Sequence, residues 1–326
     1  MLSSAAASVP LTTPDLWLTG FERGLMLAGL ALALGGLAGR GLARHYKGAR
    51  PGPLPGPWAV RGSLLGAAGS GALLLTALIG PGLAARLARP DPPGLTSGGT
   101  AQIAVVELGL FALAAIVLRL RQSGWATALL CGVVLAEGIR SHPESVVPVA
   151  GAFVTYCHLF PAALWAGMLC YALRAAIAWR AYPAAAHGIV KLYATAAAWL
   201  FAIVLITGVI SALVLVPLGS LLTTSYGLFL VAKAAVVCVA AGLAMAGRMW
   251  LRRPAAGAGP ALATKLEVAA LAVVITITGI LTVLTPPAAP SSAPSTPALG
   301  ALPASTPSRR ALPAADRQSV QTKRTD

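Results

Sequence analysis

Residues 192–216 read LYATAAAWLFAIVLITGVISALVLV, a run of 25 positions without a charged side chain. About 20 apolar residues are enough for an α-helix to cross the roughly 30 Å hydrocarbon core of a bilayer. The run lacks the period-two alternation of a barrel strand, and Ala, Leu and Val dominate it. This segment therefore predicts a transmembrane helix.

Seven other segments have the same character. Of the 326 residues, 57% are hydrophobic and only 10% are charged, whereas soluble domains carry about 25% charged residues. We therefore predict an all-α, polytopic integral membrane bundle of about eight transmembrane helices within residues 21–285. The predicted spans are Phe21–Gly39, Val60–Ile79, Ala101–Leu118, Trp125–Ile139, Gly151–Leu173, Leu192–Val216, Tyr226–Gly247 and Leu266–Thr285.

The basic residues predict the orientation of the bundle. The net charge is +15, but in a membrane protein such a surplus reflects cytoplasmic loops rather than nucleic acid. The loops after the first, third, fifth and seventh spans hold thirteen Lys and Arg, and the alternate loops hold three. Both termini are thus expected outside the cytoplasm, with residues 1–20 as an uncleaved N-terminal segment and residues 286–326 as a disordered tail rich in Pro, Ala and Ser.

Ionisable residues inside these spans call for an explanation, because each costs about 2.5–3.5 kcal/mol to insert. Glu107, Glu137, His158 and Lys233 all fall in the predicted outer half of the bilayer. Two interpretations stay open. Lys233 pairs with one of the two carboxylates as a structural ion pair, or these groups meet the loop residues His142 and Glu144 in an outer vestibule.

Sulfur ligands extend the second interpretation. Cys157 adjoins His158, and Met168 follows Cys157 by about three helical turns on nearly the same face. Thiolate and thioether select copper(I), while imidazole and carboxylate accept copper(II) or zinc. Ordinary packing is the alternative for Cys157 and Met168, as it is for the other cysteines, none of which forms a CxxC pair.

Several ordered motifs resemble the copper resistance D (CopD) family of bacterial membrane proteins. They are HLFPAALWAG at residues 158–167, Thr207 with Gly208, TTSYGLFLVAK at residues 223–233, and Glu267 with the terminal Pro286 and Pro287. The loop segment SHPES at residues 141–145 stands where the family usually has a histidine. Together they cover about residues 137–287. One departure is Lys191, Leu192 and Tyr193, where the family often has Arg-Phe-Ser.

The resemblance implies a multi-pass permease of the bacterial cytoplasmic membrane that imports copper, often with a separate extracytoplasmic copper chaperone. It nominates His142 and His158 as copper ligands, and Glu144 and Cys157 are the expected auxiliary ligands. It also nominates Trp165, Tyr226 and Lys233 as framework or pathway positions. The oxidation state of the copper ion is left open.

Other functions compete with import. A membrane copper-binding or oxidase-assembly factor would use the same vestibule without moving the ion. A haem protein needs two facing membrane histidines, and only His158 lies clearly within a span. The sequence contains no HExxH, GxSxG or Walker motif, so we expect no enzyme activity of these classes.

Overall fold

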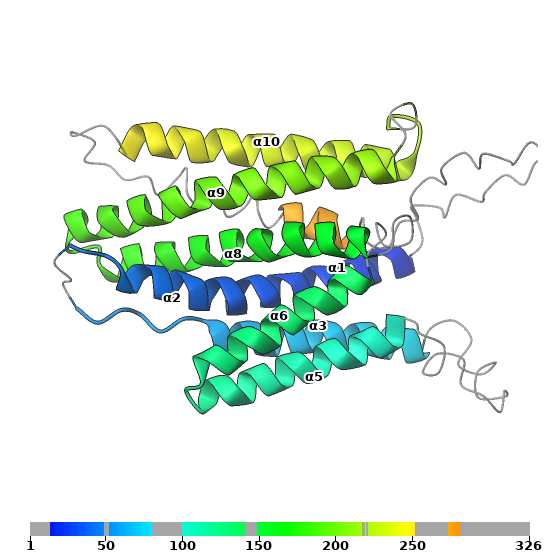
Figure 1. Cartoon of the computed structure of the whole chain (residues 1–326), viewed down its shortest axis with the longest axis horizontal. Helices are drawn as coiled ribbons and strands as arrows, with labels where there is room; N and C mark the ends of the chain where they lie inside the picture. Colours follow the sequence, from blue (N-terminus) through cyan, green and yellow to red (C-terminus); the bar gives the residue numbers. More distant parts are fainter. Residues whose placement is uncertain are drawn as a thin grey trace, which may run out of the picture. The chain divides into compact units, whose positions relative to one another are not determined.

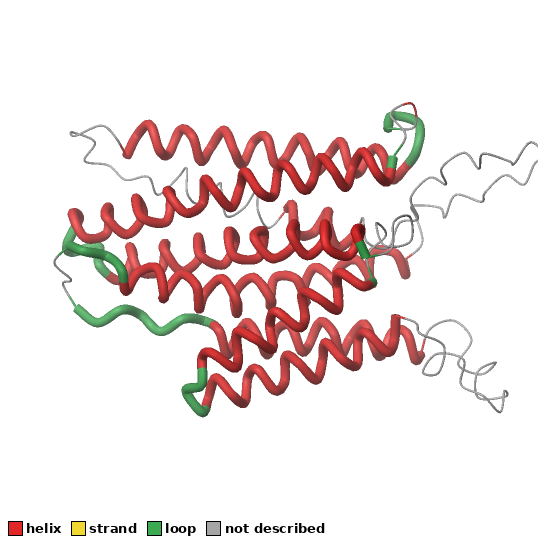
Figure 2. The backbone as a smooth tube through the Cα atoms, in the orientation of Figure 1, coloured by secondary structure: helices red, strands yellow, loops and turns green. Residues whose placement is uncertain are grey.

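The computed structural model describes residues 14–48, 52–79, 100–140, 149–216, 219, 221–251 and 273–280. All of them belong to one unit, Met1–Ala289. Within these ranges helices are the only regular elements, as Figure 2 shows in red. The predicted all-α class is confirmed. The predicted site residues His142 and Glu144 lie outside the described residues.

The first span is longer than predicted. It consists of α1 (Pro14–Leu30), the π-helical segment η1 (Ala31–Gly35) and α2 (Gly36–Arg44), which together form one continuous helix. The helix therefore begins seven residues before the predicted limit of Phe21, which places the first polar residues deeper in the bundle than the sequence suggests.

The other helices follow the predicted segments. Among the residues that the structure describes, five helices are long and apolar enough to cross a membrane, and shorter apolar stretches lie at Ser123–Ile139 and Tyr226–Val239. Most of the eighth predicted span lies outside the described residues, so the count of eight stays a prediction. The bounds are α3 Ala59–Ile79, α5 Thr100–Arg119, α6 Ser123–Ile139, α8 Ala150–Ala178, α9 Pro183–Leu215 and α10 Ser225–Leu251, with a further helical stretch at 273–280.

Two tight turns fold neighbouring helices back on each other. Between α5 and α6, Arg121 adopts a φ of 63°, a left-handed conformation that is uncommon for a residue with a side chain. Between α8 and α9, Pro183 occupies the first turn of the new helix, where its missing N–H costs nothing. Short connections of this kind make α5 and α6, and α8 and α9, antiparallel neighbours.

The helices pack in a consistent order. Contacts join α10 to α9, α9 to α8, α8 to the α1–η1–α2 helix, that helix to α3, and α3 to α5, while α6 contacts both α5 and α8. Figure 1 shows this succession from the yellow α10 at the top to the cyan α5 at the bottom. The main core is centred on the α1–η1–α2 helix and α8, and it takes further buried residues from α5, α6 and the first half of α9.

Small residues allow the closest helix crossings. A Cβ at Gly62 would lie 2.5 Å from the amide nitrogen of Ala33, and one at Gly39 would lie 2.8 Å from Cβ of Tyr171. A Cβ at Gly66 or at Gly35 would likewise meet Phe111 or Gly167. The Gly35/Gly39 and Gly62/Gly66 spacings therefore serve close helix packing.

The outer surface of α9 is apolar and open. Trp199, Ile206 and Leu213 are each more than half exposed, although the helix is among the most hydrophobic of the chain. Such a surface is unfavourable in water but suits contact with lipid tails. This feature agrees with a multi-pass membrane protein.

Candidate functional site

His158 joins α8 to α9 near the predicted outer end of the bundle. It stands about two turns after the start of α8, and its Nδ1 lies 3.0 Å from Oγ1 of Thr207 on α9. Gly208 lies beside the ring, since a Cβ at that position would be 3.1 Å from Cε1 of His158. The Thr-Gly pair thus provides a hydrogen-bond partner and room for the imidazole.

The hydrogen bonds of Thr207 determine the tautomer of His158. The Thr207 hydroxyl donates to the carbonyl of Ile203 at 2.6 Å, so its single hydrogen is used within α9. Its oxygen therefore accepts the Nδ1–H of His158. A neutral imidazole that donates from Nδ1 keeps its lone pair on Nε2, the arrangement typical of a metal-ligating histidine.

Cys157 and Lys233 are the other predicted residues near His158. Cys157 is a free, half-buried thiol next to His158 in sequence. Lys233 on α10 lies close enough for its charge to act on the imidazole. No hydrogen bond or ion pair links Lys233 to any residue in the described ranges, so the predicted pairing of Lys233 with Glu107 or Glu137 is wrong.

Both carboxylates contact Arg140 instead. Nη2 of Arg140 lies 3.1 Å from Oε1 and 3.3 Å from Oε2 of Glu107, and it also contacts Oε1 of Glu137. Glu107 is fully buried and Glu137 is 7% exposed. Arg140 directly follows α6, one turn after Glu137, and its side chain turns back into the bundle rather than entering the loop. The two carboxylates therefore belong to a separate cluster and not to the His158 site.

The predicted framework residues are buried. Trp165 packs edge-on against Phe201 of α9, with ring centroids 5.4 Å apart. Tyr226, at the start of α10, packs with Val216 and Ile280. The first contact joins α8 to α9 and the second joins the start of α10 to the end of α9, and the framework role stays a prediction.

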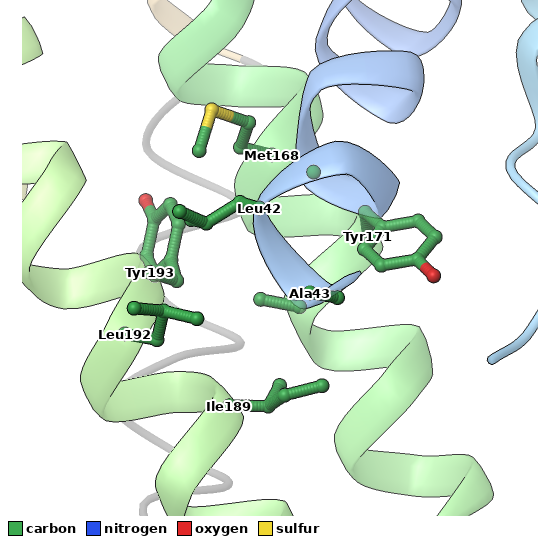
Figure 3. A pocket seen from close by; sticks show the side chains of 9 residues that line it. Leu42, Ala43, Met168, Tyr171, Ile189, Leu192 and Tyr193 are labelled. Carbon is green, nitrogen blue, oxygen red and sulfur yellow. The ribbon is translucent and has the colours of Figure 1, made fainter. Parts of the chain in front are cut away.

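Met168 lies deeper, about 15 Å along α8 from His158. It lines a small pocket with residues of α2, α8 and α9, among them Leu42, Tyr171 and Tyr193. Figure 3 shows the thioether at one side of this pocket and the Tyr171 hydroxyl pointing away from it. The pocket holds no more than about one water molecule, so in this conformation Met168 is a packing residue and not part of an open path.

Three polar residues were missed by sequence reasoning. Glu22 and Arg23 are only 6% and 8% exposed, but they fall at the very edge of the predicted first span. Arg140 was counted as a loop residue. The available signal was the adjacent pair of Glu22 and Arg23 at the start of an apolar run. Hydropathy places this pair at the edge of the span, but the helix begins earlier, so the pair lies inside the bundle.

The described residues do not by themselves form a complete metal site. No group of three or more His, Cys, Asp or Glu in these ranges is placed to hold a metal ion. A first-row metal usually takes more ligands than His158 and Cys157 supply. The remaining predicted ligands, His142 and Glu144, are in the loop between α6 and α8, outside the described residues.

Comparison with known proteins gives one match. Residues 187–285 match the family model described as Copper resistance protein D. None of the curated proteins and none of the solved structures matches the chain. The match contains Thr207, Gly208, Tyr226 and Lys233, and it confirms the resemblance predicted from the sequence. Residues 137–186, which hold His158, lie outside the matched segment.

Proposed function

We propose that this chain, whose residues 187–285 belong to the copper resistance protein D family, imports copper ions through a site at His158 in the outer part of its bundle. The observation that carries the proposal is the hydrogen bond between His158 and Thr207. This hydrogen bond connects the predicted ligand His158 to Thr207, which lies in the matched segment. It also supports an orientation in which Nε2 is available for metal binding.

The ligand set follows from the chemistry of the neighbouring residues. His158 supplies an imidazole nitrogen, and Cys157 adds a soft thiolate donor on the adjacent position of α8. His142 and Glu144 precede α8 by only a few residues, and a loop of that length can fold back across the first turns of the helix. The copper ion is the cargo, and a separate extracytoplasmic chaperone is its expected source.

Lys233 suits a site that must release its ion. The positive charge of the Lys233 ammonium near His158 repels a copper ion bound at the imidazole and weakens its binding. Transport requires binding that is favourable enough for entry yet weak enough for departure. We therefore assign Lys233 to the pathway rather than to the ligand set.

The test is metal content of the purified full-length protein. Wild type is expected to retain copper, and His158→Ala is expected to lose it. His187→Ala is the matched control, because His187 is exposed on α9 near its start, far along the helix from Thr207. Equal copper content in His158→Ala and wild type would refute the site.

A second pair of variants tests the tautomer argument. Thr207→Val removes the acceptor for Nδ1–H and should weaken copper binding about tenfold or more, as loss of the group that holds a ligating histidine in place usually does. Thr207→Ser keeps the hydroxyl and should bind copper as wild type does. Copper accumulation in cells separates import from the assembly-factor alternative, since only a transporter raises the internal pool.

A further inference from the structure

The predicted cytoplasmic end of the bundle carries a group of arginines from two helices. Arg40 and Arg44 lie one turn apart on α2, so their side chains leave the same face of that helix. Arg174 lies about one turn before the end of α8. The three guanidiniums are close enough for their charges to act on the Tyr171 hydroxyl. We call Arg40, Arg44 and Arg174 the arginine cluster.

Close packing of α2 on α8 brings the arginine cluster together. A Cβ at Gly39 would lie 2.8 Å from Cβ of Tyr171, so the small residue before Arg40 lets the two helices approach. Figure 3 shows the Tyr171 hydroxyl pointing away from the small pocket, and this hydroxyl donates a hydrogen bond of 3.0 Å to the Pro55 carbonyl. The arginine cluster therefore surrounds a hydroxyl that lies beside the segment preceding α3.

Two features leave room for a ligand at the arginine cluster. Nε of Arg40 is buried and has no hydrogen-bond partner among the described residues. Nη1 of Arg174 donates to the Gly56 carbonyl at 2.6 Å, and a Cβ at Gly56 would meet nothing within 4 Å, so there is open space beside this glycine. Arg40 therefore presents a buried donor that an acceptor oxygen of a ligand would satisfy.

The loops at this end contain no carboxylate that could neutralise the arginine cluster. The segments 40–58, 119–124, 174–191 and 248–265 contain no Asp or Glu. The ion pairs of Glu107 and Glu137 are made with Arg140, at the other end of α6. Charge complementarity therefore favours an anion from outside the chain as the partner of the cluster.

The surface next to the arginine cluster matches the boundary between lipid headgroups and lipid tails. Trp58, which contacts the Arg174 guanidinium, directly precedes α3 and is 38% exposed, and Trp side chains favour this boundary. Arg61 and Leu64 follow at three-residue spacing on the same side of α3, and both are exposed. The exposed residues thus change from aromatic and basic to apolar along α3, which suits a lipid better than a soluble anion.

We propose that the arginine cluster binds the phosphate headgroup of an anionic phospholipid, whose tails lie along the exposed apolar residues of α3. Guanidiniums pair with phosphate oxygens through parallel hydrogen bonds, and basic pockets between membrane helices on this side bind anionic headgroups. The bound lipid connects α2 and α8 at their predicted cytoplasmic ends. Arg174 lies about 24 Å along α8 from His158, so the lipid site is separate from the proposed copper site.

Native mass spectrometry of the detergent-solubilised, full-length protein tests the site. Phosphatidylglycerol is the anionic probe and phosphatidylcholine is the zwitterionic one, and wild type is expected to bind the first more tightly. Arg40→Gln should weaken phosphatidylglycerol binding about fivefold, the contribution of one basic residue near an anionic membrane surface, and leave phosphatidylcholine binding unchanged. Arg44→Gln changes an exposed residue at the end of α2. It should have the same effect, and it serves as the test if Arg40→Gln does not fold.

Arg180→Gln is the matched control, because Arg180 is exposed in the turn after α8 and is not among the arginines that act on Tyr171. This variant loses the same charge at the same end, yet it should bind phosphatidylglycerol as wild type does. An equal loss in Arg180→Gln would indicate general surface attraction and would overturn the site. Unchanged binding in both Arg40→Gln and Arg44→Gln would also overturn it. Displacement of the lipid by inorganic phosphate would identify a site for a soluble anion instead.

Discussion

Gly167 of α8 lies directly against the backbone carbonyl of Ala31, the first residue of the π-helical segment. A Cβ at Gly167 would overlap this carbonyl oxygen and would also come within 2.7 Å of Cα of Gly35. Gly167 ends the HLFPAALWAG motif that begins at His158. The motif thus contacts neighbouring helices at both of its own ends, α9 through His158 and Thr207, and η1 through Gly167.

Gly167→Ala is therefore expected to destabilise the bundle. The added methyl group meets backbone atoms that cannot rotate away, and overpacking of this kind costs about 1–3 kcal/mol. The thermal unfolding midpoint of the detergent-solubilised protein should fall. Gly109→Ala on α5 is the control, because nothing lies within 4 Å of its added Cβ. Equal midpoints for the two variants would argue against this crossing.

Arg140→Met should be among the most damaging single substitutions. It leaves Glu107 and Glu137 buried without their guanidinium, and breaking a buried ion pair from one side costs about 3–5 kcal/mol. Folded yield, measured as the monodisperse fraction in size-exclusion chromatography, should drop. The double variant Arg140→Met, Glu107→Gln should recover part of the yield.

Lys233→Met is the contrasting variant. Lys233 forms no ion pair with the described carboxylates, so its loss should leave folded yield near that of wild type. A loss as large as that of Arg140→Met would show that Lys233 is as necessary to the fold as Arg140.

The segment before α3 is held against α8 by Arg174. Its Nη1 donates to the Gly56 carbonyl at 2.6 Å and its guanidinium lies 5.0 Å from the Trp58 ring centroid, while the Tyr171 hydroxyl donates to the Pro55 carbonyl at 3.0 Å. Arg174→Met should loosen this segment at a cost of about 0.5–1 kcal/mol, since the cation–π contact is exposed. Hydrogen exchange of Leu54, Gly56 and Trp58 should become faster, while that of α9 stays unchanged.

The orientation of the chain is testable with reporter fusions. The thirteen-to-three distribution of basic loop residues predicts an extracytoplasmic C-terminus. A reporter active only in the cytoplasm should be silent after Asp326 and active when inserted after Arg121, in the turn between α5 and α6. The reverse pattern would show that the orientation is inverted, and activity at both points would show that the number of spans is odd.

The sequence by itself determined the helical membrane class, most of the helix positions and the resemblance that the match of residues 187–285 to the Copper resistance protein D model confirms. Long apolar runs such as residues 192–216 have only one stable form in a bilayer, because every backbone polar group must be satisfied within its own segment. The resemblance rested on four ordered landmarks: HLFPAALWAG, Thr207 with Gly208, TTSYGLFLVAK, and Glu267 with Pro286 and Pro287.

Only the tertiary structure decided which polar groups meet. The sequence gives the depth of a residue along its helix, but the partner depends on the rotation of that helix and on its neighbours. Glu107 and Lys233 lie at similar depths on different helices, yet Glu107 meets Arg140, which folds back from the end of α6. The early start of α1 buries Glu22 beside Thr76, and the packing of α8 on α9 turns Nδ1 of His158 to Thr207. These are long-range contacts, so no local pattern encodes them.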